Sequence, residues 1–313
     1  MGGVSMRILF MGTPEFAVGT LEALIQSRHE VVAVVTQPDR PKGRGNAVKF
    51  PPVKEAALAH GIPVLQPLKV REPEVVEQLR AFAPDLIAVA AFGQLLPKAI
   101  LEMPRYGCVN VHASLLPKYR GAAPIQWAVI NGEAESGVTT MMMSRGLDKG
   151  DMLKKSVVRL DPKETGDSLH DKLAALGGPL LLETIDELEQ GTIVRVPQDD
   201  AQSSYAPMLT KELGRIDWSK PADELERLVR GLNSWPSAYT RLHGKTLKIW
   251  DADVVSASGG EPGKVLQADK NGLVIQAGEG ALRIVSLQPE GKKRMEADAF
   301  LRGYPVQVHE RME

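Results

Sequence analysis

The sequence contains almost no cysteine. With Cys108 as the single cysteine in 313 residues, no disulfide can form within the chain, so the fold cannot depend on internal disulfides. This composition fits a reducing compartment, and we expect a cytoplasmic protein. Cys108 stands beside an apolar run, which favours a small buried residue over a nucleophile.

Net charge is also nearly absent. The 38 Lys and Arg residues and 39 Asp and Glu residues leave a formal charge of −1, so overall basicity does not indicate a nucleic-acid partner. Any binding of RNA would have to use a local basic patch. The sequence also lacks an apolar run long enough to cross a bilayer and a charged-then-apolar leader, so we expect no membrane association. Nothing in the sequence indicates an obligate protein partner.

A dinucleotide-binding fingerprint is missing as well. Apolar runs at residues 7–11 and 31–35, with a helical pattern over 15–27 between them, predict a β-α-β opening. The first turn reads Gly-Thr-Pro-Glu-Phe at residues 12–16 and does not have the G-x-G-x-x-G spacing that packs a pyrophosphate against a helix. A Rossmann-like fold is therefore expected, but a dinucleotide cofactor is not.

The chain is long enough for about two domains, and its pattern changes once. Up to residue 191, apolar runs alternate with helical patterns, which predicts a mostly parallel α/β sheet in a domain covering 1–191. We expect further strands at residues 85–90, 107–112, 137–143 and 152–160, and further helices at 52–60, 72–82, 123–131 and 165–190.

The rest of the chain differs in composition and in its pattern of helices and strands. Residues 192–213 lose periodicity and gain Pro, Ser and Gln, which predicts a linker. Residues 214–313 then show one helix and short strands with glycine-rich turns, which predict a small OB-like β-barrel domain, although another small barrel would fit. We expect the helix at residues 221–232 and the strands at 238–242, 246–250, 263–268, 272–276 and 281–287.

The strongest chemical signal lies at the predicted strand 107–112. Asn110 and His112 are two residues apart on a strand, so their side chains point to the same face. Open α/β sheets bind ligands at the carboxyl ends of their strands, and an amide beside an imidazole there suggests a site that stabilises an oxyanion. Asp148, in a loop between glycines, would orient the imidazole, favour its cationic form and handle protons. A polar strand end tied to neighbouring backbone remains the alternative for Asn110 and His112 alone.

Two motifs around these residues carry a family resemblance. His-Ala-Ser-Leu-Leu-Pro at 112–117 and Tyr-Arg-Gly-Ala-Ala-Pro-Ile-Gln-Trp-Ala at 119–128 resemble the signature of the folate-dependent formyltransferases. Gly-Thr-Pro-Glu-Phe at 12–16 and Thr-Gln-Pro-Asp-Arg-Pro at 36–41 narrow the resemblance to members that act on methionyl-tRNA. It extends from Met6 to the C-terminus.

The resemblance implies an enzyme that transfers a formyl group. The donor would be 10-formyltetrahydrofolate, the acceptor would be the α-amino group of methionine on initiator tRNA, and no metal would be needed. The resemblance implies that Asn110, His112 and Asp148 are the catalytic residues. The tetrahydrofolate site would be formed by two groups of residues, Ser114, Leu115, Leu116 and Pro117 in the first motif and Leu95 and Leu96 upstream. Ordinary core packing remains an alternative for the two upstream leucines.

A basic segment follows the second predicted strand. Residues 37–52 are long for a connection and carry Arg40, Lys42, Arg44 and Lys49 with no acid after Asp39. Such side chains suit phosphate contact, although a solvated surface loop would have the same composition. The resemblance implies that this loop binds tRNA, with Arg44 at the matching position and Arg40 and Lys42 beside it.

Two other functions fit parts of this pattern. One is a folate-dependent formyltransferase acting on a sugar-nucleotide amine or on a glycinamide ribonucleotide, and the C-terminal domain and basic loop argue against the ribonucleotide. The other is a catalytically silent RNA-binding relative, against which the intact Asn110, His112 and Asp148 argue.

Overall fold

The structure, a computed structural model, describes residues 4–42, 47–257 and 259–313. Packing groups these residues into two units, which are described separately. The N-terminal unit contains residues 1–121, 135–159 and 170–206, and the C-terminal unit contains 122–134, 160–169 and 207–313. The division at residues 191 and 213 expected from composition remains a prediction.

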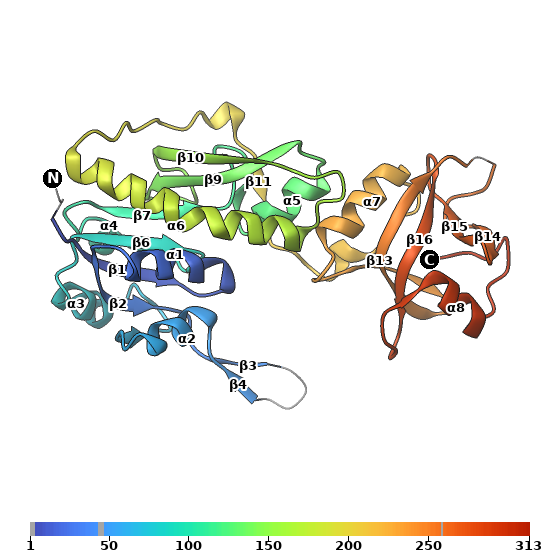
Figure 1. The fold of residues 1–313 in the computed structure, drawn as a ribbon, viewed down its shortest axis with the longest axis horizontal. Coiled ribbons are helices and arrows are strands. Elements are labelled where there is room, and N and C mark those ends of the chain that lie inside the picture. Colours follow the sequence, from blue (N-terminus) through green and yellow to red (C-terminus); the bar gives the residue numbers. More distant parts are fainter. Residues whose placement is uncertain (1–3, 43–46, 258) are drawn as a thin grey trace. The chain divides into compact units, whose positions relative to one another are not determined.

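The N-terminal unit is built on a seven-stranded, mostly parallel sheet with strand order β10-β9-β7-β6-β1-β2-β5 (Figure 1). The strands from β7 to β5 are parallel, whereas β9 is antiparallel to both β7 and β10. This confirms the predicted Rossmann-like domain. The strands are β1 (Arg7–Gly12), β2 (Glu30–Val35), β5 (Val64–Leu65), β6 (Leu86–Ala90), β7 (Cys108–His112), β9 (Glu135–Met142) and β10 (Met152–Arg159).

Helices of this unit cover both faces of the sheet. Central strands such as β6 are buried along their whole length, as a parallel strand covered on both sides must be. One face packs against residues of α3 and α4, and the other against α1 and α6. The helices named here are α1 (Glu15–Ile25), α2 (Pro52–Ala59), α3 (Pro73–Ala81), α4 (Lys98–Leu101) and α6 (Gly166–Gln190).

Two glycines let α6 approach the sheet and α1 closely. A Cβ at Gly177 would lie 2.8 Å from Thr20 Oγ1 and 3.1 Å from Val111 Cγ1, and one at Gly178 would lie 2.6 Å from the Cβ of Ala23. These contacts place Val111 of β7 on the α6 face. Since neighbouring residues of a strand point to opposite faces, Asn110 and His112 lie on the other face, together as predicted.

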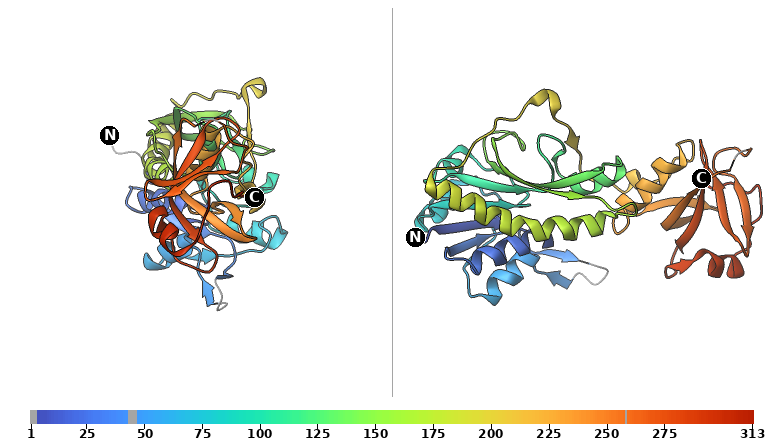
Figure 2. Two further views of the ribbon diagram at one scale, coloured as in Figure 1. Left: turned by 90° about the vertical axis from the view of Figure 1, so that its right-hand side faces the viewer. Right: turned by 45° about the horizontal axis from the view of Figure 1, so that its top comes forward.

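The basic segment contains two short strands that the sequence pattern did not predict. β3 (Arg40–Lys42) and β4 (Ala47–Lys49) form an antiparallel hairpin, which projects away from the sheet (Figures 1 and 2). Each strand has only three residues, and a run of that length is too short to be identified by periodicity. Arg44 lies outside the described residues.

The C-terminal unit contains an antiparallel sheet with strand order β12-β13-β16-β15-β14, and β17 pairs with β16. This confirms the predicted OB-like β domain, and its core is one cluster of buried residues from the strands and from α7 and α8. The elements are α5 (Pro124–Ile130), α7 (Ala222–Gly231), β12 (Ala238–Leu242), β13 (Lys245–Val255), β14 (Val265–Asp269), β15 (Gly272–Gln276), β16 (Ala281–Pro289), β17 (Met295–Glu296) and α8 (Ala297–Gly303).

The last residues of the chain join the two edges of this sheet. Glu313 exchanges backbone hydrogen bonds of 2.9 and 3.0 Å with Arg241 of β12. Met312 N donates to Gly263 O at 2.8 Å, and Val265 N of β14 donates to Glu310 O at 2.8 Å. The chain end therefore pairs with both edge strands, which would otherwise present unpaired backbone groups.

We expect Met312→Ala to destabilise the C-terminal unit by about 2–5 kcal/mol, because it removes a buried side chain and leaves a cavity. Met312 is 1% exposed and belongs to the core, as does Trp218. Urea unfolding followed by tryptophan fluorescence would measure the change. Met208→Ala, at a methionine that is 73% exposed, is the matched control. If both variants unfold at the same urea concentration, the chain end does not stabilise the unit.

Candidate active site

The site is centred on the end of β7, where Asn110 and His112 are 8% and 6% exposed. The strand is held between β6 and β9, with Asn110 paired to Val89 on one side and Met141 on the other. Among the described residues, no hydrogen bond is made by the Asn110 side-chain amide. Its donors and its acceptor therefore remain open to a ligand.

The His112 ring is fixed by a backbone carbonyl. Nε2 lies 2.8 Å from the carbonyl oxygen of Tyr119, and because a carbonyl only accepts, Nε2 carries the proton of this bond. Tyr119 has φ = 58°, an uncommon backbone conformation for a bulky residue, so the carbonyl is presented by a constrained turn. Nδ1 is the ring nitrogen that remains for chemistry.

Asp148 faces that nitrogen. Its Oδ2 lies 3.8 Å from His112 Nδ1, too long for a hydrogen bond but close enough for a strong charge interaction. The same oxygen accepts a hydrogen bond of 2.8 Å from the backbone amide of Gly121. The ring is therefore oriented by Tyr119, while Asp148 supplies a negative charge beside it. The orienting role expected of Asp148 remains a prediction.

The residues of the first motif form a tight turn after β7. Ser114 Oγ donates to Lys118 O at 2.6 Å, and Lys155 Nζ donates to Leu116 O at 2.6 Å. Ser114 and Leu116 are 1% and 0% exposed, so their side chains are packed within the protein. Leu115 and Pro117 are half-buried. Burial lowers the pKa of the Lys155 ammonium.

The upstream leucines lie in different environments. Leu95 is 73% exposed, whereas Leu96 packs against the core cluster that includes α3 and α4. Beside them, the Gln94 side chain bonds to Pro67 O at 3.2 Å and accepts from Val70 N at 2.7 Å, which ties this turn to the segment after β5. The exposed Leu95 is available to a ligand, whereas Leu96 supports the turn by packing against the core.

The basic hairpin is anchored at its base by Asp39. The carboxylate accepts from Lys54 Nζ at 2.7 Å and from Gln66 Nε2 at 2.7 Å, and these two bonds lower the pKa of Asp39. Arg40 is exposed on β3. Lys42 ends that strand, and its side chain lies outside the described residues, as does Arg44.

Two residues near the site were not identified from the sequence. Gln198 donates through Nε2 to the carbonyl oxygens of Asp148 and Gly150 at 2.8 and 2.7 Å, and Arg120 Nε donates to Gln198 Oε1 at 3.0 Å. Arg120 lies in the motif at residues 119–128, but Gln198 lies in the predicted linker, where the sequence has no periodic pattern that could identify a functional residue. Only the folded chain brings it to Asp148.

Cys108 has no catalytic character. Burial raises the pKa of its thiol to about 12, and Sγ lies 3.5 Å from Ile100 O. The thiolate form needed by a nucleophile is therefore scarce near neutral pH.

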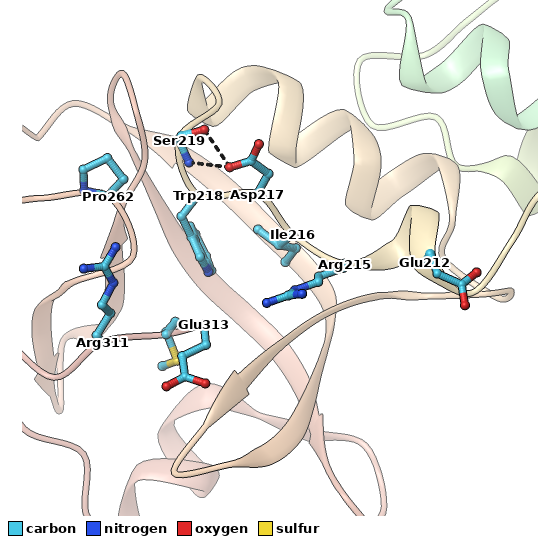
Figure 3. Close-up of a pocket in the computed structure, with 10 residues that line it drawn as sticks. Glu212, Arg215, Ile216, Asp217, Trp218, Ser219, Pro262, Arg311 and Glu313 are labelled. Carbon is cyan, nitrogen blue, oxygen red and sulfur yellow. Dashed lines mark hydrogen bonds between the residues drawn. The ribbon is translucent and has the colours of Figure 1, made fainter.

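A separate cavity of about 650 Å³ lies entirely within the C-terminal unit (Figure 3). Figure 3 shows the hydrogen bonds between Ser219 and Asp217 at its edge. None of its lining residues belongs to the N-terminal unit, so it is not the site around β7. It is lined by Glu212, Arg215, Ile216, Asp217, Trp218, Ser219, Pro262, Arg311, Met312 and Glu313.

No helix in the described part of the chain is long and apolar enough to cross a membrane.

Solved structures show where this fold occurs. A complex of HypX from Aquifex aeolicus with tetrahydrofolic acid has a TM-score of 0.62 at 21% identity, covering 98% of this chain and 49% of that one. The sugar 3N-formyl transferase WlaRD, solved with dTDP and 5-N-formyl-THF, has a TM-score of 0.66 at 19% identity, covering 93% and 100%. At these identities the likeness concerns the fold alone.

Sequence relatives are much closer. The methionyl-tRNA formyltransferase of Agathobacter rectalis is 59% identical over 96% of this chain and 98% of its own length. That of Geobacter sulfurreducens is 52% identical, over 98% and 96%. The formyl transferase family model matches residues 6–185, and the model for the formyl transferase C-terminal domain matches residues 208–305. The chain therefore belongs to the formyl transferase family, among the methionyl-tRNA formyltransferases.

Proposed function

We propose that the protein transfers the formyl group of 10-formyltetrahydrofolate to the α-amino group of methionine on initiator tRNA. The observation that carries this proposal is the convergence of an open amide, a ring nitrogen and a carboxylate at the end of β7. The high identity to methionyl-tRNA formyltransferases supports the choice of reaction. A cytoplasmic location belongs to the same proposal, because both substrates serve translation there.

The acceptor needs little activation. An α-amino group in a peptide has a pKa of roughly 7.7 to 8.0, so a useful fraction is already neutral near pH 7. The neutral nitrogen attacks the formyl carbon directly, and a new carbon–nitrogen bond forms while negative charge moves to the formyl oxygen. A protein nucleophile is not required, which agrees with the inert environment of Cys108.

Asn110 and His112 stabilise this developing charge. The Asn110 amide is fixed on β7 between two strands, so its N–H group is positioned before the reaction begins. In cationic His112, Nδ1–H is a second donor, because Nε2–H is already occupied by Tyr119 O. The carboxylate of Asp148 lies beside this donor, with Oδ2 3.8 Å from Nδ1.

Asp148 also takes the proton from the attacking nitrogen. Its Oδ2 is held by Gly121 N, and a carboxylate oxygen has lone pairs left to accept the amine proton. As the bond between the formyl carbon and the folate nitrogen breaks, that nitrogen takes up the proton that Asp148 had accepted, which returns Asp148 to its carboxylate form. The products are then a formylated amine and tetrahydrofolate, so atoms and charges balance.

The folate donor supplies the electrophilic formyl carbon, and residues near β7 would hold it. Leu95 is exposed beside the site's upstream turn and offers an apolar surface for a flat ring system. The turn at Ser114, Leu115, Leu116 and Pro117 shapes the other side, with Leu116 acting from within the core. These steps require no metal, and we propose that the enzyme uses none.

The basic hairpin would bind the tRNA. Asp39 fixes its base through Lys54 and Gln66, so the exposed Arg40 and the strand end at Lys42 are presented on an anchored support. Cationic side chains on such a hairpin suit the phosphate groups of a folded RNA. We expect Arg44, which lies between β3 and β4 in the sequence, to make the most specific contact.

Asn110→Ala and His112→Ala should each lower kcat by about a hundred- to a thousandfold, because each removes an oxyanion donor. Steady-state formylation of Met-tRNA measures the effect, and circular dichroism checks the fold. Gln26→Ala, which removes an exposed amide at the end of α1, is the control. Near-parental turnover in either variant would contradict the role assigned to that residue.

Asp148→Asn should keep the hydrogen bond from Gly121, since an amide oxygen also accepts, but it removes the charge and the proton acceptor. We expect kcat to fall by about 10²- to 10⁴-fold with the KM for the folate donor nearly unchanged. Initial rates across donor concentrations separate the two constants. A loss confined to donor KM would make Asp148 a binding residue instead.

Arg44→Ala should raise the KM for Met-tRNA or lower kcat/KM for it several-fold, and leave the KM for the folate donor unchanged. The reason is loss of a planar cation that Lys does not replace equally on RNA. Arg159→Ala is the matched control, since that arginine side chain is 89% exposed on β10. If both variants formylate Met-tRNA like the parent, the hairpin is a solvated surface segment.

A further inference from the structure

The loop that carries Asp148 has an unusual backbone. Asp148 adopts φ = 52°, in the left-handed region that most side chains disfavour, and Gly146 has φ = 105°. At Gly150 an added Cβ would lie 1.7 Å from Met142 O, so the chain passes too close to β9 for any other residue. A loop with this conformation needs partners that hold it in place.

Gln198 is one such partner. Its single amide nitrogen donates to the carbonyl oxygens of Asp148 and Gly150, at 2.8 and 2.7 Å. It thus links two alternate residues of the loop and fixes the peptide planes that follow Asp148 and Gly150. Both donor protons of the amide are used in these two bonds.

Arg120 fixes the orientation of that amide. Its Nε donates to Gln198 Oε1 at 3.0 Å, and since a guanidinium never accepts, the oxygen and nitrogen of the amide are assigned without ambiguity. Arg120 Nη1 pairs with Asp200 at 2.8 Å, which lowers the pKa of that carboxyl. Arg120 is 6% exposed, and its Nη2 is buried without a partner among the described residues.

The contacts close into a ring around Asp148. From Asp148 O the path runs through Gln198 to Arg120 and along the chain to Gly121, whose amide returns to Asp148 Oδ2 at 2.8 Å. The short strands β8 (Arg120–Gly121) and β11 (Tyr205–Ala206) pair in parallel and hold this turn against residues that follow Gln198. Backbone and carboxylate of Asp148 are therefore fixed by one connected network.

We infer that Gln198 is a positioning residue for formyl transfer, which acts by holding the Asp148 carboxylate at its distance from His112 Nδ1. This rests on the catalytic role proposed above for Asp148. A displacement of about 1 Å at a reacting group can cost about a hundredfold in rate, so loss of Gln198 should lower kcat without weakening substrate binding.

The experiment compares Gln198→Ala in two backgrounds, the parent and Asp148→Asn, by steady-state formylation of Met-tRNA. We expect kcat to fall about ten- to a hundredfold in the parent, with both KM values within about twofold, and to fall no further in Asp148→Asn. Gln202→Ala is the matched control, because that exposed glutamine lies in the same segment and its side chain bonds, within the described part of the chain, only to Asp199, at 3.2 Å. If Gln198→Ala fails to fold, Gln198→Met keeps the volume while removing the donors.

The outcomes separate this inference from the proposed function. An unchanged kcat in Gln198→Ala, beside a slow Asp148→Asn, overturns the role of Gln198 and leaves that of Asp148 intact. An equal fold-loss in both backgrounds also overturns it, because Gln198 would then act independently of the carboxylate. If Asp148→Asn itself turns over like the parent, the role proposed for Asp148 fails, and the inference falls with it.

Discussion

The site depends on the hydrogen bond from the Gly121 amide to Asp148. A carboxylate that is only 14% exposed must be satisfied, and this backbone donor satisfies it without neutralising its charge. Gly121 has φ = 111°, and an added Cβ would lie 2.6 Å from the Tyr205 ring, so the turn admits glycine alone. The carboxylate is thereby held beside His112 rather than bonded to it, and it remains free to take a proton.

The sheet supplies the other half of the arrangement. Because β7 is enclosed by β6 and β9, the residues at its end cannot move independently, and Asn110 and His112 are presented on one face. The α6 helix covers the opposite face through the close approach at Gly177. Preorganised donors of this kind need little rearrangement when charge develops, which is the physical basis of oxyanion stabilisation.

Much of the fold could be predicted because its signals are local. Long apolar runs such as residues 85–90 predicted the Rossmann-like sheet, and the short strands with glycine-rich turns in the C-terminal part predicted the antiparallel β domain. The grouping of Asn110 with His112 followed from strand periodicity. The β3–β4 hairpin was not predicted, because three-residue strands carry no periodic signal. Helix α8 was also not predicted.

The remaining features of the site are long-range. The bond from His112 to the Tyr119 carbonyl depends on the left-handed backbone of Tyr119, a conformation that the motif at 119–128 does not predict. Gln198 is 50 residues from Asp148 in the chain, in a segment without regular pattern. Contacts of this type are set by how loops close in three dimensions, so they become visible only in the structure.

The central claim is that this site formylates methionine on tRNA, and a substrate panel tests it most directly. The purified protein would be given 10-formyltetrahydrofolate with Met-tRNA, free methionine, a dTDP-amino sugar or glycinamide ribonucleotide in separate single-turnover reactions. We expect formylation of Met-tRNA at a rate far above that of the other three amines. Formylation of the sugar nucleotide at a higher rate than Met-tRNA, or no transfer to Met-tRNA, would contradict the account.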